Sequence, residues 1–271
     1  MTREAGRPRA VACDLDGTLL RNDLTVSPRT RQALADVEAA GILLVFVTGR
    51  PPRWIRPVAE QTDHRGLVIC ANGAQLYDLH TEKVVGEDLI SPETLAEVVG
   101  MVRGAVPGVT FGMEYGDQFA YETAFPMEDK WHSADHRKVP AEELLLRPGA
   151  KLIMRHADQT SDQLVGAISD VVGGLLEITH SSYRGPAFIE ASAAGVTKAT
   201  ALARLCASHG IGPEDVVAFG DMRNDLPMLG WAGRPYAMAN AHPDVLAAVE
   251  NHAPTNEEDG VAAVIEELLR S

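Results

Sequence analysis

Three short apolar runs near the N-terminus alternate with helical patterns, and this alternation constrains the fold more than any other feature. The runs are AVAC at 10–13, ILLVFV at 42–47 and LVICAN at 67–72. Ser27-Pro28 supplies an N-cap and a first-turn proline for a helix through about Ala40, and Pro51-Pro52 opens a second helix. Continuous apolar runs are typical of parallel strands covered on both faces. The pattern therefore predicts an α/β fold with a doubly wound parallel sheet.

The rhythm changes between about residues 83 and 190. This stretch holds two predicted helices, behind Ser91-Pro92 and from Ser161, and the strand-like pieces VTFGMEY, QFAYET, KLIMRHA, LLEITH and AFIEAS. A connection of roughly 100 residues is far longer than ordinary loops, so it must have a core of its own. After Gly195 the α/β rhythm returns, with a strand at VVAFGD (216–221) and a last helix over about 257–269. We expect a core domain formed by 1–83 and 190–271 and an inserted α+β cap domain at 84–189.

The charge and cysteine content exclude several classes of protein. The 271 residues include 38 acidic and 24 basic ones, a formal net charge of −14, which repels nucleic acid and anionic membranes. No run approaches the roughly 20 apolar residues of a membrane span, and the N-terminus lacks the apolar stretch of a signal peptide. The three cysteines are too scattered for a disulfide framework. We expect a cytoplasmic protein, either a monomer or a small homo-oligomer, without nucleic acid or membrane partners.

Two aspartates follow the first apolar run, in ACDLDGTLL. Asp14 and Asp16 come at the carboxyl end of the predicted strand, the edge where open α/β sheets bind ligands. Residues two apart on an extended segment point the same way, so both carboxylates can address one site. Two like charges held close together are unfavourable without a cation between them or a proton on one of them, and we expect Mg²⁺, which prefers carboxylate oxygens. The alternative is that Asp-Gly serves only as a turn.

A second polar cluster follows the apolar strand VVAF, in GDMRNDLPML at 220–229. Asp221, Asn224 and Asp225 again place oxygen ligands at the end of a strand. Asp or Asn before a helix can also be a simple N-cap. Because the cluster accompanies the first acidic pair at an equivalent strand end, a shared metal site is the stronger interpretation.

Two further features could bind an anion. Thr48 ends the run VFVTGR, and Gly49 after it allows the backbone to approach an anion closely. Lys198 lies near the start of a predicted helix, where the helix dipole disfavours a cation, unless the lysine is directed at a bound phosphate. An ordinary strand terminator and a solvated surface lysine are the respective alternatives.

The four segments resemble, in order, the four motifs of haloacid dehalogenase-type phosphohydrolases. They are DLDGTLL at Asp14, VTGR at Thr48, GVTK at Lys198 and GDMRND at Asp221. The sequence is most similar to the Cof-type branch, whose α+β cap (type IIB) lies between the second and third motifs. NGA at Asn72, AMANA at Ala237 and NEEDGVA at Asn256 add to the likeness.

The resemblance implies a Mg²⁺-dependent phosphatase that acts through an aspartyl phosphate. Asp14 would be the nucleophile, and Asp16 would protonate the leaving oxygen and then activate water. Mg²⁺ would be held by Asp14, by the backbone carbonyl of Asp16 and by Asp221, with Asp225 and Asn224 supporting from nearby.

The phosphoryl oxygens would be bound by Thr48 and Lys198, and we expect the substrate to contact Gly49, Arg50 and Asn224 as well. The expected substrates are small phosphorylated metabolites, such as sugar phosphates or similar phosphomonoesters. The cap would act as a lid and contact the leaving group.

Specificity residues are harder to name. The stretch 127–138 holds the candidates Trp131, His132, His136, Arg137 and Lys138, with a solvated loop as the alternative, and Arg50 and Arg184 are comparable candidates. Two other functions stay open at this point. One is a phosphomutase of the phosphomannomutase type, and the other is a non-catalytic sensor of a phosphorylated ligand.

Overall fold

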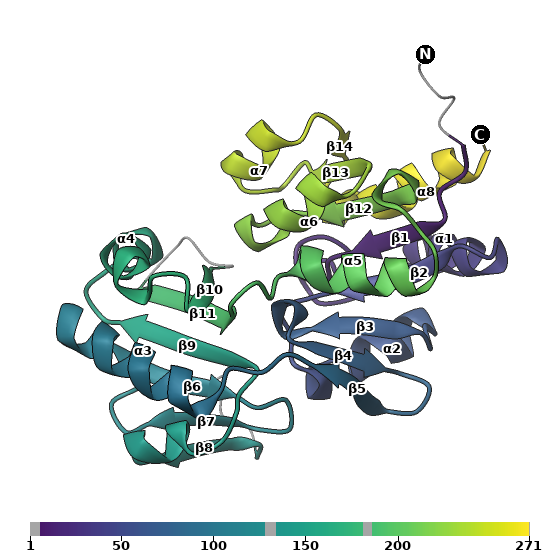
Figure 1. The fold of residues 1–271 in the computed structure, drawn as a ribbon. Helices are drawn as coiled ribbons and strands as arrows, with labels where there is room; N and C mark the ends of the chain where they lie inside the picture. The colour runs from purple at the N-terminus through teal and green to yellow at the C-terminus, as the bar shows by residue number, and fades with distance from the viewer. Residues whose placement is uncertain (1–5, 128–133, 181–185, 271) are drawn as a thin grey trace. The chain divides into compact units, whose positions relative to one another are not determined.

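The computed structural model describes residues 6–127, 134–180 and 186–270, and the chain divides into two compact units (Figure 1). The first unit contains the residues up to 50, 54–85 and those from 197 onward. The second contains 51–53 and 86–196.

The first unit is built on an eight-stranded sheet with the order β14-β13-β12-β1-β2-β3-β4-β5. The strands are β1 (Ala10–Cys13), β2 (Leu43–Val47), β3 (Leu67–Cys70), β4 (Gln75–Asp78), β5 (Lys83–Glu87), β12 (Val216–Gly220), β13 (Arg234–Met238) and β14 (His252–Ala253). Strand β1 is central and runs parallel to both β12 and β2, and the parallel pairing continues to β3 on one side and to β14 on the other. The predicted parallel sheet is therefore confirmed, and the residues after β1, β2, β3 and β12 meet at one edge.

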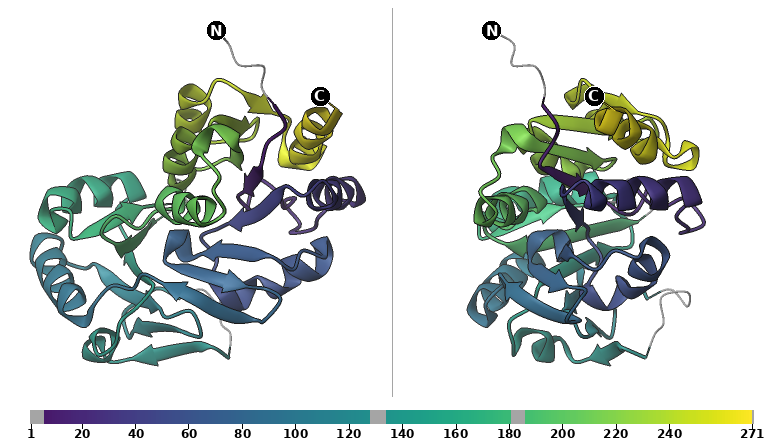
Figure 2. Two further views of the ribbon diagram at one scale, coloured as in Figure 1. Left: turned by 45° about the vertical axis from the view of Figure 1, so that its right-hand side comes forward. Right: turned by 90° about the vertical axis from the view of Figure 1, so that its right-hand side faces the viewer.

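Helices cover both faces of this sheet (Figure 2). They are α1 (Pro28–Ala39), α2 (Arg56–Thr62), α5 (Lys198–Ser208), α6 (Leu226–Trp231), α7 (Pro243–Ala248) and α8 (Gly260–Arg270), with 3-10 turns at Pro52–Trp54, Ala71–Gly73, Pro213–Asp215, Arg223–Asp225 and Asn256–Glu258. The purple α1 and the yellow α8 pack side by side on one face, and the green α5 and α6 pack on the other. Two apolar layers thus enclose the strands, which explains why β1, β2 and β12 are apolar throughout.

The second unit is an α+β domain with a six-stranded sheet in the order β10-β11-β9-β6-β7-β8. Its elements are α3 (Pro92–Ala105), β6 (Thr110–Glu114), β7 (Phe119–Glu122), β8 (His136–Val139), a 3-10 turn (Ala141–Leu145), β9 (Lys151–His156), α4 (Ser161–Val172), β10 (Leu176–Thr179) and β11 (Ala187–Ala193). Helices α3 and α4 pack together on one face of the sheet (Figure 1). This unit has an apolar core of its own.

The structure corrects three expectations about the elements. The helix expected to open at Pro51-Pro52 is a 3-10 turn, and α2 begins only at Arg56. The last helix begins at Gly260 rather than near 257, because Asp259 has a positive φ of +59°. Strand β4 returns antiparallel to β3, so the sheet is not parallel throughout. Strand β5, which extends the same edge, is exposed along its whole length, and its two adjacent valines, Val84 and Val85, do not show the alternation of a half-buried strand.

The cysteine expectation is confirmed, since all three cysteines are free and buried. Among the described residues, no helix combines the length and the apolar character needed to cross a bilayer.

Candidate active site

The side chain of Asp14 is held by a buried lysine. Asp14 directly follows β1, and Lys198 is the first residue of α5, which Thr197 caps. Lys198 Nζ lies 2.6 Å from Asp14 Oδ1 and 2.6 Å from Asp225 Oδ1. Burial alone would lower the pKa of Lys198, but the two carboxylates raise it above the usual value. The lysine is therefore a charged ammonium inside the site, and the surface alternative is wrong because its side chain is only 1% exposed.

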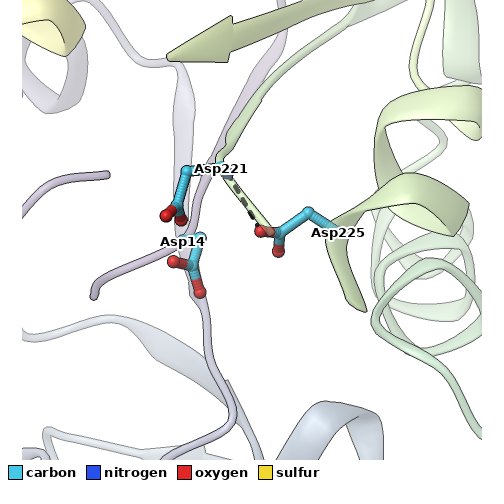
Figure 3. A group of neighbouring side chains, drawn as sticks. All are labelled: Asp14, Asp221 and Asp225. Atoms are coloured by element: carbon cyan, nitrogen blue, oxygen red, sulfur yellow. Dashed lines mark hydrogen bonds between the residues drawn. The ribbon is translucent and has the colours of Figure 1, made fainter. Parts of the chain in front are cut away.

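Three buried carboxylates gather around this lysine (Figure 3). Asp14, Asp221 and Asp225 each offer an oxygen, and these oxygens lie within 4.8 Å of one another. Burial, partly offset by Lys198 and reinforced by the neighbouring carboxylates, raises the pKa of Asp14 well above its usual value. Burial and the charge of Asp225 raise the pKa of Asp221 to about 7. Three acidic groups against one ammonium leave an excess of negative charge that a divalent cation would neutralise.

Asp225 also shapes the turn that carries Asp221. Its Oδ2 accepts from the backbone N–H of Asp221 at 3.1 Å and of Met222 at 3.0 Å, while Oδ1 accepts from Lys198. The side chain is fully buried and all of these bonds are charge-assisted. Both oxygens of Asp225 thus already accept hydrogen bonds, from Lys198 and from the turn. Asp14 and Asp221 therefore have more capacity to bind a cation.

The turn after Asp14 packs directly on Asp221. Thr18 Oγ1 donates to Asp221 Oδ1 at 3.0 Å. Gly17 has φ +79°, and a Cβ there would lie 2.4 Å from Asp221 Oδ2, so only glycine permits this approach. Asn240 donates from Nδ2 to the Gly17 carbonyl at 2.7 Å. Sequence reasoning assigned no role to Thr18 or Asn240, although the AMANA likeness contains the latter.

Asp16 does not join the three carboxylates. Arg50 donates from Nε to Asp16 Oδ2 at 2.7 Å and from a terminal nitrogen to Oδ1 at 2.5 Å, so the guanidinium holds both carboxylate oxygens. The Asp16 side chain is 52% exposed, whereas Asp14 is buried. The chain turns immediately after β1, and the two aspartates therefore do not share one direction as an extended segment would require. The expected metal contact of Asp16 is its backbone carbonyl, and that expectation is unaffected.

Thr48 and Gly49 form the turn after β2. The Thr48 N–H donates to Ile69 O at 2.8 Å, and Thr48 Oγ1 accepts from the Arg50 N–H at 3.1 Å. Thr48 is buried, and a Cβ at Gly49 would lie 3.1 Å from Asn72 Oδ1. Strand β3 and the loop that follows it therefore pack against this turn and fix its position.

Asn224 contributes an unused acceptor to the site. Its Nδ2 donates to Asn72 Oδ1 at 3.2 Å, and its Oδ1 is buried without a hydrogen-bond partner in the described part of the chain. A buried acceptor left unpaired is costly, so this oxygen is suited to a donor that arrives with a ligand.

The cap candidates are only partly described. Trp131, His132 and Arg184 lie outside the described residues. His136, Arg137 and Lys138 form part of strand β8, so the loop interpretation is wrong for them. Strand β8 is an edge of the six-stranded sheet, with Arg137 and Lys138 exposed.

The family model described as haloacid dehalogenase-like hydrolase matches residues 11–265. The chain belongs to this family. A match over almost the whole chain includes both separated core segments and the inserted unit. The resemblance read from the four motifs is therefore confirmed.

Three similar proteins illustrate the likeness. The chain is 31% identical to the 5-amino-6-(5-phospho-D-ribitylamino)uracil phosphatase YcsE of Bacillus subtilis, over 95% of this chain and 94% of that protein. It is 28% identical to the pyridoxal phosphate phosphatase YbhA of Escherichia coli, over 95% and 97%. Among solved structures, a haloacid dehalogenase-like hydrolase from Bacteroides thetaiotaomicron superposes with a TM-score of 0.76 and 27% identity, over 97% and 100%.

Proposed function

We propose that the protein is a Mg²⁺-dependent phosphatase that hydrolyses small phosphorylated metabolites through an aspartyl phosphate on Asp14. The observation that carries the proposal is the buried group formed by Asp14, Lys198 and Asp221. It combines a nucleophilic carboxylate, a fixed ammonium and a carboxylate free to bind a cation. Chains in which these groups converge have the electrostatic parts that phosphoryl transfer requires.

The residues fit a bound Mg²⁺. Asp14 and Asp221 would supply carboxylate oxygens and Asp16 its backbone carbonyl, with Asp225 and Asn224 supporting the turn beside them. Burial first, and then the charges of the neighbouring carboxylates, raise the pKa values of Asp14 and Asp221, and a bound cation would balance that charge. When bound, Mg²⁺ would neutralise charge on the phosphoryl oxygens and draw them toward Asp14.

The first half of the reaction forms the intermediate. An oxygen of Asp14 attacks phosphorus, a new P–O bond forms, and the bond from phosphorus to the leaving oxygen breaks. Asp16 gives its proton to that oxygen, so the product leaves as a neutral alcohol. Lys198, fixed beside Asp14, offsets the charge that the nucleophile and the phosphoryl group bring together. Thr48, Gly49 and the second N–H of Asn224 Nδ2 would contact the phosphoryl oxygens.

The second half restores the enzyme. Asp16, now a carboxylate, takes a proton from a water molecule that attacks phosphorus. The bond between phosphorus and the Asp14 oxygen breaks, inorganic phosphate leaves, and Asp16 is protonated again. Arg50 donates to both oxygens of Asp16 and so orients this carboxyl group for both transfers, and one of the two bonds opens when Asp16 carries the proton.

The relatives support a small phosphomonoester as the substrate. Two of the proteins named above are phosphatases of 5-amino-6-(5-phospho-D-ribitylamino)uracil and of pyridoxal phosphate. Their leaving groups differ, and both are small polar molecules. We therefore place sugar phosphates and similar phosphomonoesters in the substrate class of this chain.

The decisive experiment measures phosphate release by the purified protein. The panel contains sugar phosphates, nucleotides, phosphoglycolate, flavin mononucleotide and pyridoxal phosphate, each with and without Mg²⁺. We expect Mg²⁺-dependent release with at least one of them, and none with Asp14→Asn. Asp36→Asn, a change to an exposed aspartate of α1, is the matched control. Mg²⁺-dependent turnover by Asp14→Asn would overturn the nucleophile assignment, and phosphoryl transfer between sugar positions without free phosphate would indicate a phosphomutase instead.

A further inference from the structure

The loop that follows β3 is strained at two residues that are not glycine. Ala71 has φ +51° and Asn72 has φ +57°, and both are buried. Asparagine visits this left-handed region more readily than most residues, whereas alanine does so rarely. Such strain persists only where the surroundings fix it, and it concentrates at functional sites.

Backbone bonds tie this loop to the turn after β2. The Asn72 N–H donates to Thr48 O at 3.0 Å, and the Ala71 N–H donates to Arg50 O at 2.9 Å. On its other side the loop approaches α5, since a Cβ at Gly73 would lie 2.3 Å from the carbonyl oxygen of Thr197. The strained loop is thus packed between the segments that carry Thr48 and Lys198.

The Asn72 side chain links two of the expected phosphate contacts. Its Oδ1 accepts a hydrogen bond from Asn224 Nδ2 at 3.2 Å. The same oxygen packs closely on Gly49, since a Cβ added to Gly49 would lie 3.1 Å from it. Asn72 is only 3% exposed. The bond to Asn72 uses one of the two N–H groups of Asn224 Nδ2 and so fixes the amide plane. Asn224 Oδ1 is a buried acceptor without a partner in the described chain.

We propose that Asn72 is a positioning residue of the phosphoryl site, holding the Thr48-Gly49 turn and the Asn224 amide in fixed register. The strained backbone of Asn72 fixes the position of the Thr48-Gly49 turn through the bond to Thr48 O. The side-chain amide of Asn72 fixes the orientation of the Asn224 amide. Asn72 acts through these residues and takes no part in bond making. The inference rests on the proposed phosphatase function, because it needs a phosphoryl group to be bound between them.

Asn72→Gly tests the side chain separately from the backbone. Glycine adopts positive φ freely, so the loop keeps its shape while the amide is lost. We expect the variant to stay folded with a modestly lower thermal midpoint, because a buried hydrogen bond is lost. The KM for a phosphomonoester and the inhibition constant for inorganic phosphate should rise together, by about tenfold, with a smaller change in kcat. Asp63→Gly is the matched control, because it also replaces a positive-φ residue by glycine, at the exposed end of α2, and it should leave both constants unchanged.

A second variant covers the case in which Asn72→Gly does not fold. Asn72→Asp keeps the shape and the acceptor oxygen, but it places a carboxylate beside the proposed anion site, so phosphate affinity should fall. Unchanged phosphate affinity in either folded variant would overturn the inference, and so would equal losses in Asn72→Gly and Asp63→Gly.

Calorimetric titration with inorganic phosphate and Mg²⁺ separates this inference from the proposed function. If the original chain releases phosphate from no substrate, the proposed function fails. The relative phosphate affinities of the Asn72 and Asp63 variants still decide the role of Asn72.

Discussion

Lys198 donates from its ammonium nitrogen to Asp14 Oδ1 at 2.6 Å, although the two residues are 184 positions apart in the chain. The sheet brings them together, because Asp14 ends the central strand β1 and Lys198 begins α5 on the face beside it. The same ammonium holds Asp225. One cation therefore organises two of the three buried carboxylates before any metal or substrate binds.

Lys198→Met should abolish most activity and also destabilise the fold. Methionine fills a similar volume but leaves Asp14 and Asp225 without their shared cation, and breaking a buried ion pair costs about 3–5 kcal/mol. We expect kcat/KM to fall by roughly 10²–10³-fold and the urea midpoint to drop. Lys83→Met, on the exposed strand β5, is the control. Near-normal turnover by Lys198→Met would contradict the assignment of its ammonium to the phosphoryl site.

Arg50→Lys should impair proton transfer more than phosphate binding. Lysine keeps the charge but cannot reproduce the forked contact with both oxygens of Asp16. General acid catalysis matters most for poor leaving groups, so kcat/KM for an alkyl phosphate should fall by about 10²-fold and that for an aryl phosphate by less. Arg56→Lys, an exposed residue of α2, provides the comparison. Equal losses on the two substrates would show that Arg50 does not act through Asp16.

Mg²⁺ should stabilise the folded chain through Asp221. A ligand at 100 times its Kd adds about 2.7 kcal/mol to the free energy of unfolding. We therefore expect Mg²⁺ to raise the thermal midpoint of the original chain and of Asp36→Asn, and to have little effect on Asp221→Asn. Chelation of the metal should stop phosphate release and reverse the shift. A full Mg²⁺ shift in Asp221→Asn would place the cation elsewhere.

The sequence allowed the strands and the four polar segments to be predicted, because each rests on a local pattern. AVAC and VVAF are apolar throughout and form β1 and most of β12, and the polar residues after them lie at the sheet edge as expected. The turn residues that shape the site also gave local signals, as Gly17 does in DGT. Burial on both faces and turn chemistry are properties that a short window of sequence displays.

What could not be predicted depends on contacts between distant segments. The fork from Arg50 to Asp16 joins two loops, and no spacing in either motif indicates it. The strain at Ala71 is equally invisible, because alanine gives no signal for a positive φ. Strand β5 was missed for a different reason, since it is exposed and pairs at the sheet edge through its backbone. Long-range pairing and backbone strain are tertiary properties that override local preference.

Asp259→Asn should lower stability at neutral pH and lose that effect in acid. Burial raises the pKa of Asp259, but hydrogen bonds from Ser27 and Arg21 and the charge of Arg21 lower it below its usual value. A lowered carboxyl pKa contributes stability above the unfolded value near 3.9, and this contribution disappears as pH falls through the folded value. Arg21 lies 2.8 Å from Asp259 Oδ1, and losing this partly buried pair should cost about 1 kcal/mol at pH 7.

Asparagine tolerates the positive φ at this position, so a change in backbone strain does not contribute to the difference in stability between Asp259→Asn and the original chain. Urea midpoints of Asp259→Asn and the original chain should therefore differ at pH 7 and converge below about pH 4, while Glu267→Gln, an exposed change on α8, shows no such trend. A difference that persists unchanged into acid would mean that the ionised carboxylate is not what stabilises this contact.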